Sequence, residues 1–175
     1  MDLRNKRGVT MISLVVTIIV MIVVTTAIVY RTKNQVNLQK YDALQSDIMA
    51  INNAIQEYYL KNNDVPVICE YATKENLELI MKSEGVENVF FDSNDEGKYY
   101  VIDLGKLDNL TLNFGQDYKE IKKNIANVTQ YKDVYVINLV SHKVYYPKCV
   151  KANDVMYYTD YIENEVILYQ EINDV

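Results

Sequence analysis

One stretch near the N-terminus constrains the fold of this chain more than any other. From Val9 to Tyr30, 22 successive residues carry no formal charge. A helix of this length rises ~33 Å, which is enough to cross a hydrocarbon core of ~30 Å. Sixteen of the 21 residues from Val9 to Val29 are β-branched, which disfavours a helix in water, but in lipid every backbone group must bond within its own segment. We therefore predict a transmembrane helix at 9–30.

Basic residues on both sides of this span indicate its orientation. Arg4, Lys6 and Arg7 precede it, and Arg31 and Lys33 follow it. Cytoplasmic flanks carry the excess of Lys and Arg, so we expect a single-pass protein of the cell membrane with a cytoplasmic N-terminus and an extracellular remainder. The span exceeds the apolar region of about 7–15 residues in a secretory signal peptide, and no small-x-small site closes it.

The helical pattern continues beyond the span and becomes amphipathic. Apolar residues recur at spacings of three and four, which is typical of a helix with one buried face. No proline or glycine interrupts 9–61, so we predict one helix about 53 residues and ~80 Å long. Asn62, Asn63 and Pro66 then provide the signal that we expect to end the helix. The residues of this apolar stripe are Leu38, Tyr41, Leu44, Ile48, Ile51, Ile55 and Tyr58.

The segment 62–175, called the head below, is the size of one domain and reads as α+β. Thr73 is suited to cap a short helix, in which Leu77, Ile80 and Met81 form an apolar face and which Gly85 ends. Alternating apolar residues then predict strands. The fold class we expect is α+β, with the long N-terminal helix packed on a small antiparallel sheet.

The strand and helix predictions in the head cover seven further segments. We expect YYVIDL (99–104) and NLTLNF (109–114) to be paired strands, and 118–128 to be a short helix. We expect a hairpin of strands 134–139 and 143–147 with its turn at 140–142. Two further edge strands are predicted at 156–159 and 165–170.

Charge and composition restrict the partners of the head. The whole chain has 18 basic and 24 acidic residues, and Met1 to Gly8 contain three of the basic and one of the acidic ones. Residues 9–175 therefore contain 15 basic and 23 acidic residues and carry a net charge of −8. Nucleic-acid binding depends on Lys and Arg contacts to phosphate, so this charge disfavours a nucleic-acid partner. Sixteen tyrosines and no tryptophan are typical of a half-buried antiparallel sheet.

Two cysteines, Cys69 and Cys149, lie in the part assigned to the outside of the cell, where disulfides persist. A bridge between them would close a loop of ~80 residues and stabilise the fold by about 4–5 kcal/mol in the chain-entropy model. Two free buried thiols are the alternative. The sequence leaves both open.

The residues that carry most enzyme chemistry are sparse in this chain. The single histidine, His142, follows Ser141 at a predicted turn, and adjacency alone does not make a triad. The sequence has no phosphate-binding glycine loop and no zinc-type cluster. We expect a turn role for His142 and predict neither an enzyme nor a cofactor.

One segment partly matches a calcium-binding loop. Asp92, Asn94, Glu96, Gly97 and Asp103 fall at positions one, three, five, six and twelve of that pattern. Glu at position five and the short Asp at position twelve depart from it. A solvated turn with Gly97 in a left-handed conformation accounts for the same residues and is the reading we prefer.

At the N-terminus, a basic leader (1–8) ends in Gly8, and an apolar helix that begins at Val9 runs on into an amphipathic half. This arrangement resembles the class III signal of type IV prepilins and pseudopilins, in which the cut would fall between Gly8 and Val9. Thr10 to Ile12 (TMI) resemble the family's common Thr-Leu-Ile, and the head resembles more loosely those of pilin-like proteins of Gram-positive bacteria. The resemblance implies a prepilin peptidase that cleaves the leader and methylates Val9. It also implies assembly with other pilin subunits through the helix, driven by a platform protein and an ATPase, into a surface filament of a type IV pilus or secretion system.

One residue departs from the family pattern. The fifth position after the cut is usually glutamate, held to pair with the N-terminal amine of a neighbouring subunit, and here it is Ser13. A hydroxyl cannot neutralise that amine, and in lipid a missing charge pair is costly. A minor subunit, placed once at a tip, would tolerate this loss better than one repeated along the filament.

Two other functions fit the same anchor. The head could be a receptor or adhesin, with a DNA-uptake role disfavoured by its charge. The chain could also be a single-pass membrane-anchored binding or sensor protein whose anchor stays uncleaved. An N-terminus at Met1 would indicate the uncleaved anchor, and one at Val9 would indicate the pilin.

Overall fold

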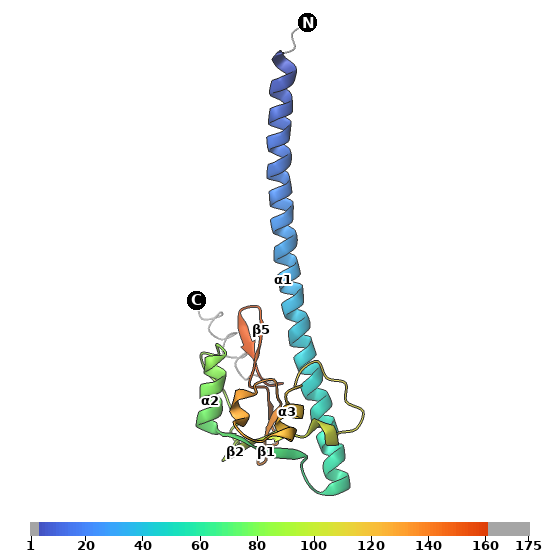
Figure 1. Ribbon diagram of the computed structural model, residues 1–175, viewed down its shortest axis with the longest axis vertical. Coiled ribbons are helices and arrows are strands. Elements are labelled where there is room, and N and C mark those ends of the chain that lie inside the picture. The colour runs from blue at the N-terminus through green and yellow to red at the C-terminus, as the bar shows by residue number, and fades with distance from the viewer. Residues whose placement is uncertain (1–3, 161–175) are drawn as a thin grey trace. The chain divides into compact units, whose positions relative to one another are not determined.

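The computed structural model describes residues 4–160, and before residue 38 it describes the side chains of 15–23, 25 and 36 only (Figure 1). The chain divides into two units, Met1–Gln39 and Lys40–Val175. The element common to both is helix α1, Arg4–Asn62, whose 59 residues include the predicted helix at 9–61. Among the side chains that the structure describes, no helix is both long and apolar enough to span a bilayer. Much of the predicted span at 9–30 lies outside those side chains, so the span stays a prediction.

Local interactions determine where helix α1 ends. Asn63 has a positive φ of 53°, and its N–H donates to the carbonyl oxygen of Tyr59 at 2.7 Å. A left-handed residue of this kind terminates many helices, and asparagine tolerates it better than most side chains. Pro66 follows, is buried, and precedes the first strand. The stop signal predicted at 62–66 is therefore confirmed.

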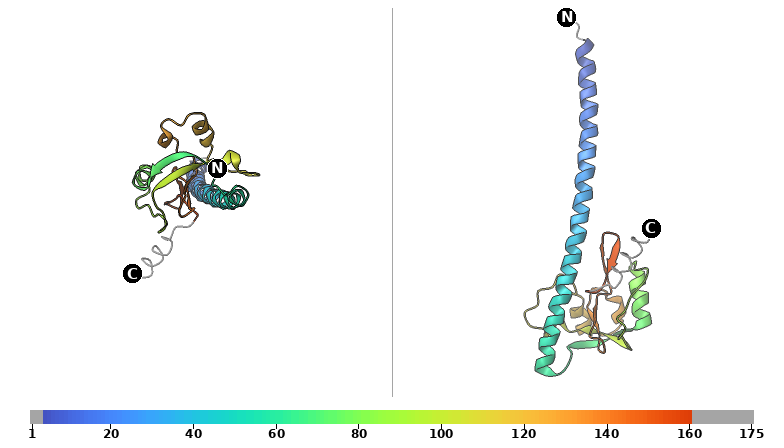
Figure 2. Two further views of the ribbon diagram at one scale, coloured as in Figure 1. Left: turned by 90° about the horizontal axis from the view of Figure 1, so that it is seen from below. Right: turned by 180° about the vertical axis from the view of Figure 1, so that it is seen from behind.

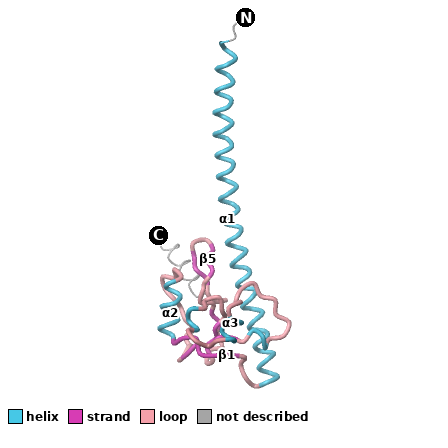
Figure 3. Tube along the Cα trace, in the orientation of Figure 1, coloured by secondary structure: helices cyan, strands magenta, loops and turns pink. Residues whose placement is uncertain are grey.

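The unit Lys40–Val175 is α+β, with a four-stranded antiparallel sheet in the order β1-β2-β3-β4 (Figures 1 and 2). A two-stranded sheet of β5 and β6 lies apart from it, and loops connect most elements (Figure 3). The strands are β1 Val67–Thr73, β2 Lys98–Ile102, β3 Val136–Asn138, β4 Val144–Tyr145, β5 Val150–Ala152 and β6 Val155–Tyr157. The helices after α1 are α2 Lys74–Ser83, η1 Leu104–Lys106, α3 Tyr118–Lys123 and η2 Val128–Gln130.

The main sheet is buried on both faces. Successive residues of β3 alternate between two cores: Val136 packs in the cluster that includes α2, and Ile137 packs in the cluster that includes α1. The same alternation separates Val101 from Ile102 on β2. Since side chains of a strand point to opposite faces, apolar residues on both faces mean that helices cover both sides. The predicted stripe supplies Leu44, Ile48, Ile51 and Ile55 to the second cluster.

The helix predicted after Thr73 is confirmed. α2 begins directly after Thr73, whose hydroxyl accepts a hydrogen bond from the N–H of Asn76 at 3.5 Å. Leu77 and Met81 are fully buried, and Gly85 has φ +101° beyond the helix end. These local signals define both ends without help from the rest of the fold.

The predicted pairing of 99–104 with 109–114 is wrong. β2 lies between β1 and β3, with Tyr100 opposite both Glu70 and Ile137, and 109–114 is loop. The N–H groups of Asn113 and Phe114 donate to the Asp47 carboxylate at 2.8 and 3.0 Å. A side chain of α1 thus satisfies backbone donors that a strand would have used in a ladder. The prediction also missed β1.

The hairpin is confirmed, and two other elements differ from expectation. β3 and β4 pair with Val136 opposite Tyr145. The helix expected over 118–128 stops at Lys123, because Asn124 adopts an extended conformation and its side chain accepts from the N–H of Ala126 at 3.0 Å. The strand expected at 156–159 is β6, paired with β5 rather than with the main sheet. The strand predicted at 165–170 lies outside the described residues.

Candidate functional site

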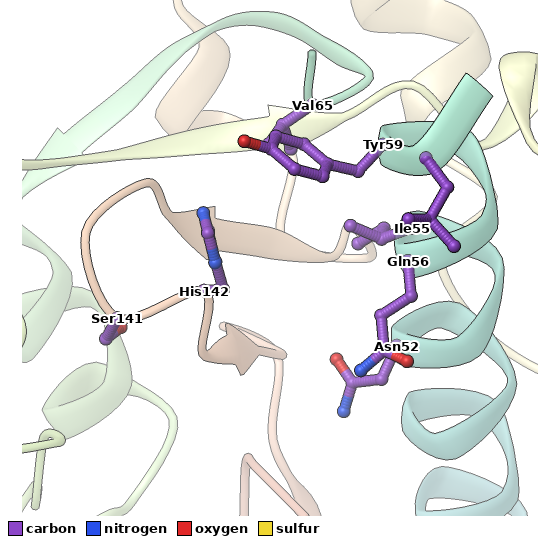
Figure 4. Close-up of a pocket in the computed structure, with 8 residues that line it drawn as sticks. Asn52, Ile55, Gln56, Tyr59, Val65, Ser141 and His142 are labelled. Atoms are coloured by element: carbon purple, nitrogen blue, oxygen red, sulfur yellow. The ribbon is translucent and has the colours of Figure 1, made fainter. Parts of the chain in front are cut away.

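A groove of about 570 Å³ lies between the last turns of α1 and the turn that joins β3 to β4 (Figure 4). Its volume falls within the range of about 300–1,000 Å³ that is typical of binding sites. Every residue that lines it belongs to the unit Lys40–Val175. We call it the α1–hairpin groove, and its lining residues are Asn52, Ile55, Gln56, Tyr59, Leu60, Val65, Ser141 and His142.

The helix wall of the groove adjoins the apolar stripe. Asn52, Gln56 and Leu60 succeed one another at spacings of four and so share one side of α1. Ile55 is buried, whereas Tyr59 is 45% exposed and Leu60 is 85% exposed. The groove therefore presents apolar surface to solvent, flanked by two side-chain amides.

The opposite wall is held by a buried asparagine. Asn138 is fully buried, and its side-chain oxygen accepts from the N–H groups of Val140 and Ser141 at 2.9 and 3.2 Å. Its side-chain amide donates to the carbonyl oxygen of Glu96 at 2.8 Å. These bonds shape the turn so that His142, at φ +58°, faces Tyr59 across the groove with ring centroids 6.4 Å apart (Figure 4).

The geometry assigns Ser141 a structural role. Its hydroxyl donates to the buried carboxylate of Asp95 and accepts from the N–H of Lys143 at 3.1 Å. Asp95 also accepts from the hydroxyls of Tyr99 and Tyr145, at 2.9 and 2.6 Å. Burial raises the pKa of both tyrosines, and their hydrogen bonds to Asp95 raise it further. Ser141 thus belongs to a hydrogen-bonded cluster of the fold, and His142 lies at the turn where the sequence places it.

The predicted processing and assembly residues lie in the first unit. Gly8, Val9 and Ser13 are all within α1, and their side chains are outside those that the structure describes. The structure thus places the predicted cut inside a continuous helix. Their roles stay predictions.

The structure holds Cys69 and Cys149 as free thiols. Cys149 is buried in the cluster that includes α2, and Cys69 packs against the same cluster. Burial raises the pKa of the Cys149 thiol to about 12, with a further increase from the Glu84 carboxylate and an opposing effect of Lys132. Burial also raises the pKa of Cys69. Of the two alternatives that the sequence leaves open, the structure thus has the free thiols, although both cysteines contact the same core.

We expect Cys149 to be alkylated very slowly in the folded chain. With a pKa of about 12, its thiolate fraction at pH 8 is roughly a thousandfold below that of a thiol at the ordinary value, so its rate with iodoacetamide should fall at least as much relative to denatured chain. The half-buried Cys69 is the internal control and should react faster. Mass spectrometry of labelled peptides measures the alkylation rates of Cys69 and Cys149.

The raised pKa of Cys149 also predicts how stability depends on pH. The free energy of unfolding should keep its full value below about pH 9 and decline as pH rises toward about 12, because the thiol ionises more readily in the unfolded chain.

Two results would contradict this account of the thiols. Equal labelling of Cys149 in folded and denatured chain would contradict its burial. Absence of labelling at both cysteines in denatured, unreduced chain would show that the bridge forms after all.

The residues of the calcium-loop pattern do not converge. Lys98 to Ile102 form β2, and Asp103 caps η1 and pairs with Lys122 at 2.9 Å. The Asp92 side chain accepts from the N–H of Asn94 at 2.9 Å, which is a turn contact. Gly97 has φ +71°, as predicted for the turn. Among the side chains that the structure describes, no group of three or more acidic, His or Cys residues could hold a metal ion.

Comparison of the chain with protein-family models, with curated proteins and with solved structures finds no match in any of the three.

Proposed function

We propose that this protein is a minor subunit of a type IV pilus or of a related secretion filament, processed between Gly8 and Val9. The observation that carries the proposal is the leader NKRG followed at once by an uncharged stretch within helix α1, Arg4–Asn62. Such a helix suits a subunit whose first half packs in a membrane or filament core and whose second half carries a head.

The packing of the second half of α1 supports this division of roles. Leu44, Ile48 and Ile51 are fully buried against the sheet side of the head. Burying each aliphatic side chain contributes about 1.5–3 kcal/mol, so these residues attach the head firmly to its helix.

Ser13 supports the assignment to a minor subunit placed at the tip. The fifth residue after the proposed cut lacks the carboxylate that would neutralise a neighbouring amine. The cost of an unpaired amine in lipid is incurred once by a tip subunit and at every contact by a shaft subunit. Adhesion or initiation of assembly would follow from that position.

The α1–hairpin groove favours a second candidate function. A single-pass protein with an uncleaved anchor and an extracellular binding head would use a concave, partly apolar site of this volume. The two candidates differ in what happens at Gly8.

Replacing Gly8 tests the proposal. We expect wild-type protein extracted from membranes to begin at methylated Val9, and Gly8→Phe to begin at Met1, because a bulky residue before the cut would not fit a peptidase site adapted to glycine. Asn5→Phe is the matched control and should still be processed. N-terminal sequencing and peptide mass spectrometry measure the outcome. Wild-type protein that begins at Met1 would reject processing and favour the uncleaved anchor.

A further inference from the structure

We propose that the α1–hairpin groove is the docking site of the chain's own C-terminal segment, residues 161–175. This inference goes beyond the proposed pilin function and does not depend on it, since it concerns only the unit Lys40–Val175. It competes with the second candidate function, which assigns the same groove to a separate ligand. It is carried by the direction in which the chain leaves the described residues, by the composition of the segment and by the lining of the groove.

The chain runs along the outer edge of the sheet before it reaches residue 161. The N–H of Tyr146 donates to the carbonyl oxygen of Tyr158 at 2.7 Å, and the hydroxyl of Thr159 donates to the carbonyl oxygen of Val144 at 2.8 Å. β4 is the edge strand there. As the chain advances from 158 to 159, its partner on β4 moves back from 146 to 144, so the two run antiparallel. At residue 160, the last that the structure describes, the chain therefore runs toward the turn that carries His142.

Asp160 lies at the end of the groove. Its carboxylate pairs with Lys143 at 2.6 Å and accepts from the side-chain amide of Asn52 at 3.5 Å. The side-chain amide of Gln45 donates to the carbonyl oxygen of Thr159 at 3.1 Å. Asn52 is itself a lining residue of the groove. The last described residue is therefore held between the helix wall and the hairpin wall.

The composition of the segment fits the groove. Residues 166–169 are Val, Ile, Leu and Tyr, and Ile172 follows. Leu60 and Tyr59 expose apolar surface that such residues would cover. The segment carries acidic residues and no basic ones, and the groove lining contains no carboxylate that would repel it.

Reach also favours the segment over a separate molecule. The helix wall from Asn52 to Leu60 is ~12 Å long at the rise of a helix, and five or six extended residues cover ~17–20 Å. Val166 can therefore reach the far end of the groove. A tethered segment acts at an effective concentration of about millimolar, so it would outcompete a second copy of the chain at ordinary protein concentrations.

Photo-cross-linking of the full chain in detergent tests the docking. A benzophenone amino acid replaces Leu60, which is 85% exposed and so tolerates substitution. We expect cross-linked peptides that join residue 60 to the segment 161–175 within one chain, identified by mass spectrometry. The matched control places the same amino acid at Lys61, which is exposed and lines a separate hollow with Glu57 and Asp108. There we expect at least about tenfold less of the product.

A second pair of variants makes the test independent of the photo-reactive residue. Leu168→Asp should lower the yield at position 60 roughly tenfold, because a carboxylate would be placed against apolar surface. Asn173→Asp adds the same charge outside the apolar run and should leave the yield unchanged. Cross-links between two chains would overturn the proposal and assign the groove to an interface between copies. Absence of products from the segment, or equal yields at 60 and 61, would overturn it as well.

Discussion

Asp47→Ala is expected to lower the free energy of unfolding of the head by about 3–5 kcal/mol. Asp47 is 1% exposed, and its carboxylate accepts from the N–H groups of Asn113 and Phe114, the side-chain amide of Asn113 and the hydroxyl of Tyr135. Alanine would leave these donors buried without an acceptor. Urea denaturation of the detergent-solubilised full chain, followed by the near-ultraviolet circular dichroism of its tyrosines, measures the change.

Two controls separate the hydrogen bonds of Asp47 from other effects of the substitution. Asp42→Ala changes an exposed aspartate of the same helix and should alter stability by no more than about 0.5 kcal/mol. Tyr135→Phe removes one of the four donors and should cost about 1–2 kcal/mol. If Asp47→Ala cost no more than Asp42→Ala, the carboxylate would not hold the 113–114 loop to the helix.

Gly115→Ala is expected to cost about 2–5 kcal/mol of stability for two reasons. Gly115 has φ +83°, a conformation that costs an L residue about 1–2 kcal/mol. A Cβ atom there would also lie 2.7 Å from Cδ2 and 2.8 Å from Cε2 of Tyr135, whose ring is 1% exposed. Forcing atoms into a packed core costs a further ~1–3 kcal/mol. The same denaturation experiment measures the loss.

Gly97→Ala is the matched control for the packing part of this effect. Gly97 has a similar φ of +71°, but a Cβ atom there would have no neighbour within 4 Å. Its replacement should therefore cost about 1–2 kcal/mol, from the backbone conformation alone. A loss at Gly115 no larger than that at Gly97 would mean that the Tyr135 ring moves aside at little cost.

The elements that were predicted correctly depend on local signals. The short helix after Thr73 is defined by a cap at one end and a glycine at the other, and the β3–β4 hairpin joins segments that are neighbours in sequence. In both cases the residues that decide the structure lie within a few positions of one another. Such interactions can be read from a sequence because no distant partner has to be known.

The errors in the strand predictions have the opposite cause. NLTLNF alternates as a strand does, and Leu110, Leu112 and Phe114 do pack in the cluster that includes α1. Its backbone donors, however, are satisfied by Asp47, which lies 66 residues away from Asn113. β1 was missed although it pairs with β2, because apolar residues follow one another along this seven-residue run without strict alternation, and its two buried residues, Tyr71 and Ala72, are consecutive. Pairing between distant segments is not encoded in the pattern of either one.

By itself, the sequence determined the helical pattern of α1, the cap of α2, the position of the hairpin and the residue types around the proposed cut. All of these follow from the period of apolar residues or from short-range chemistry along one stretch of chain. Only the tertiary structure decided that Asp47 and Asp95, which read as ordinary polar residues, are buried acceptors for tyrosines from other elements. It also decided that the last turns of α1 and the β3–β4 turn form a groove. The physical reason is that burial and acceptor geometry depend on which distant segments meet, and these contacts form only when the whole head folds.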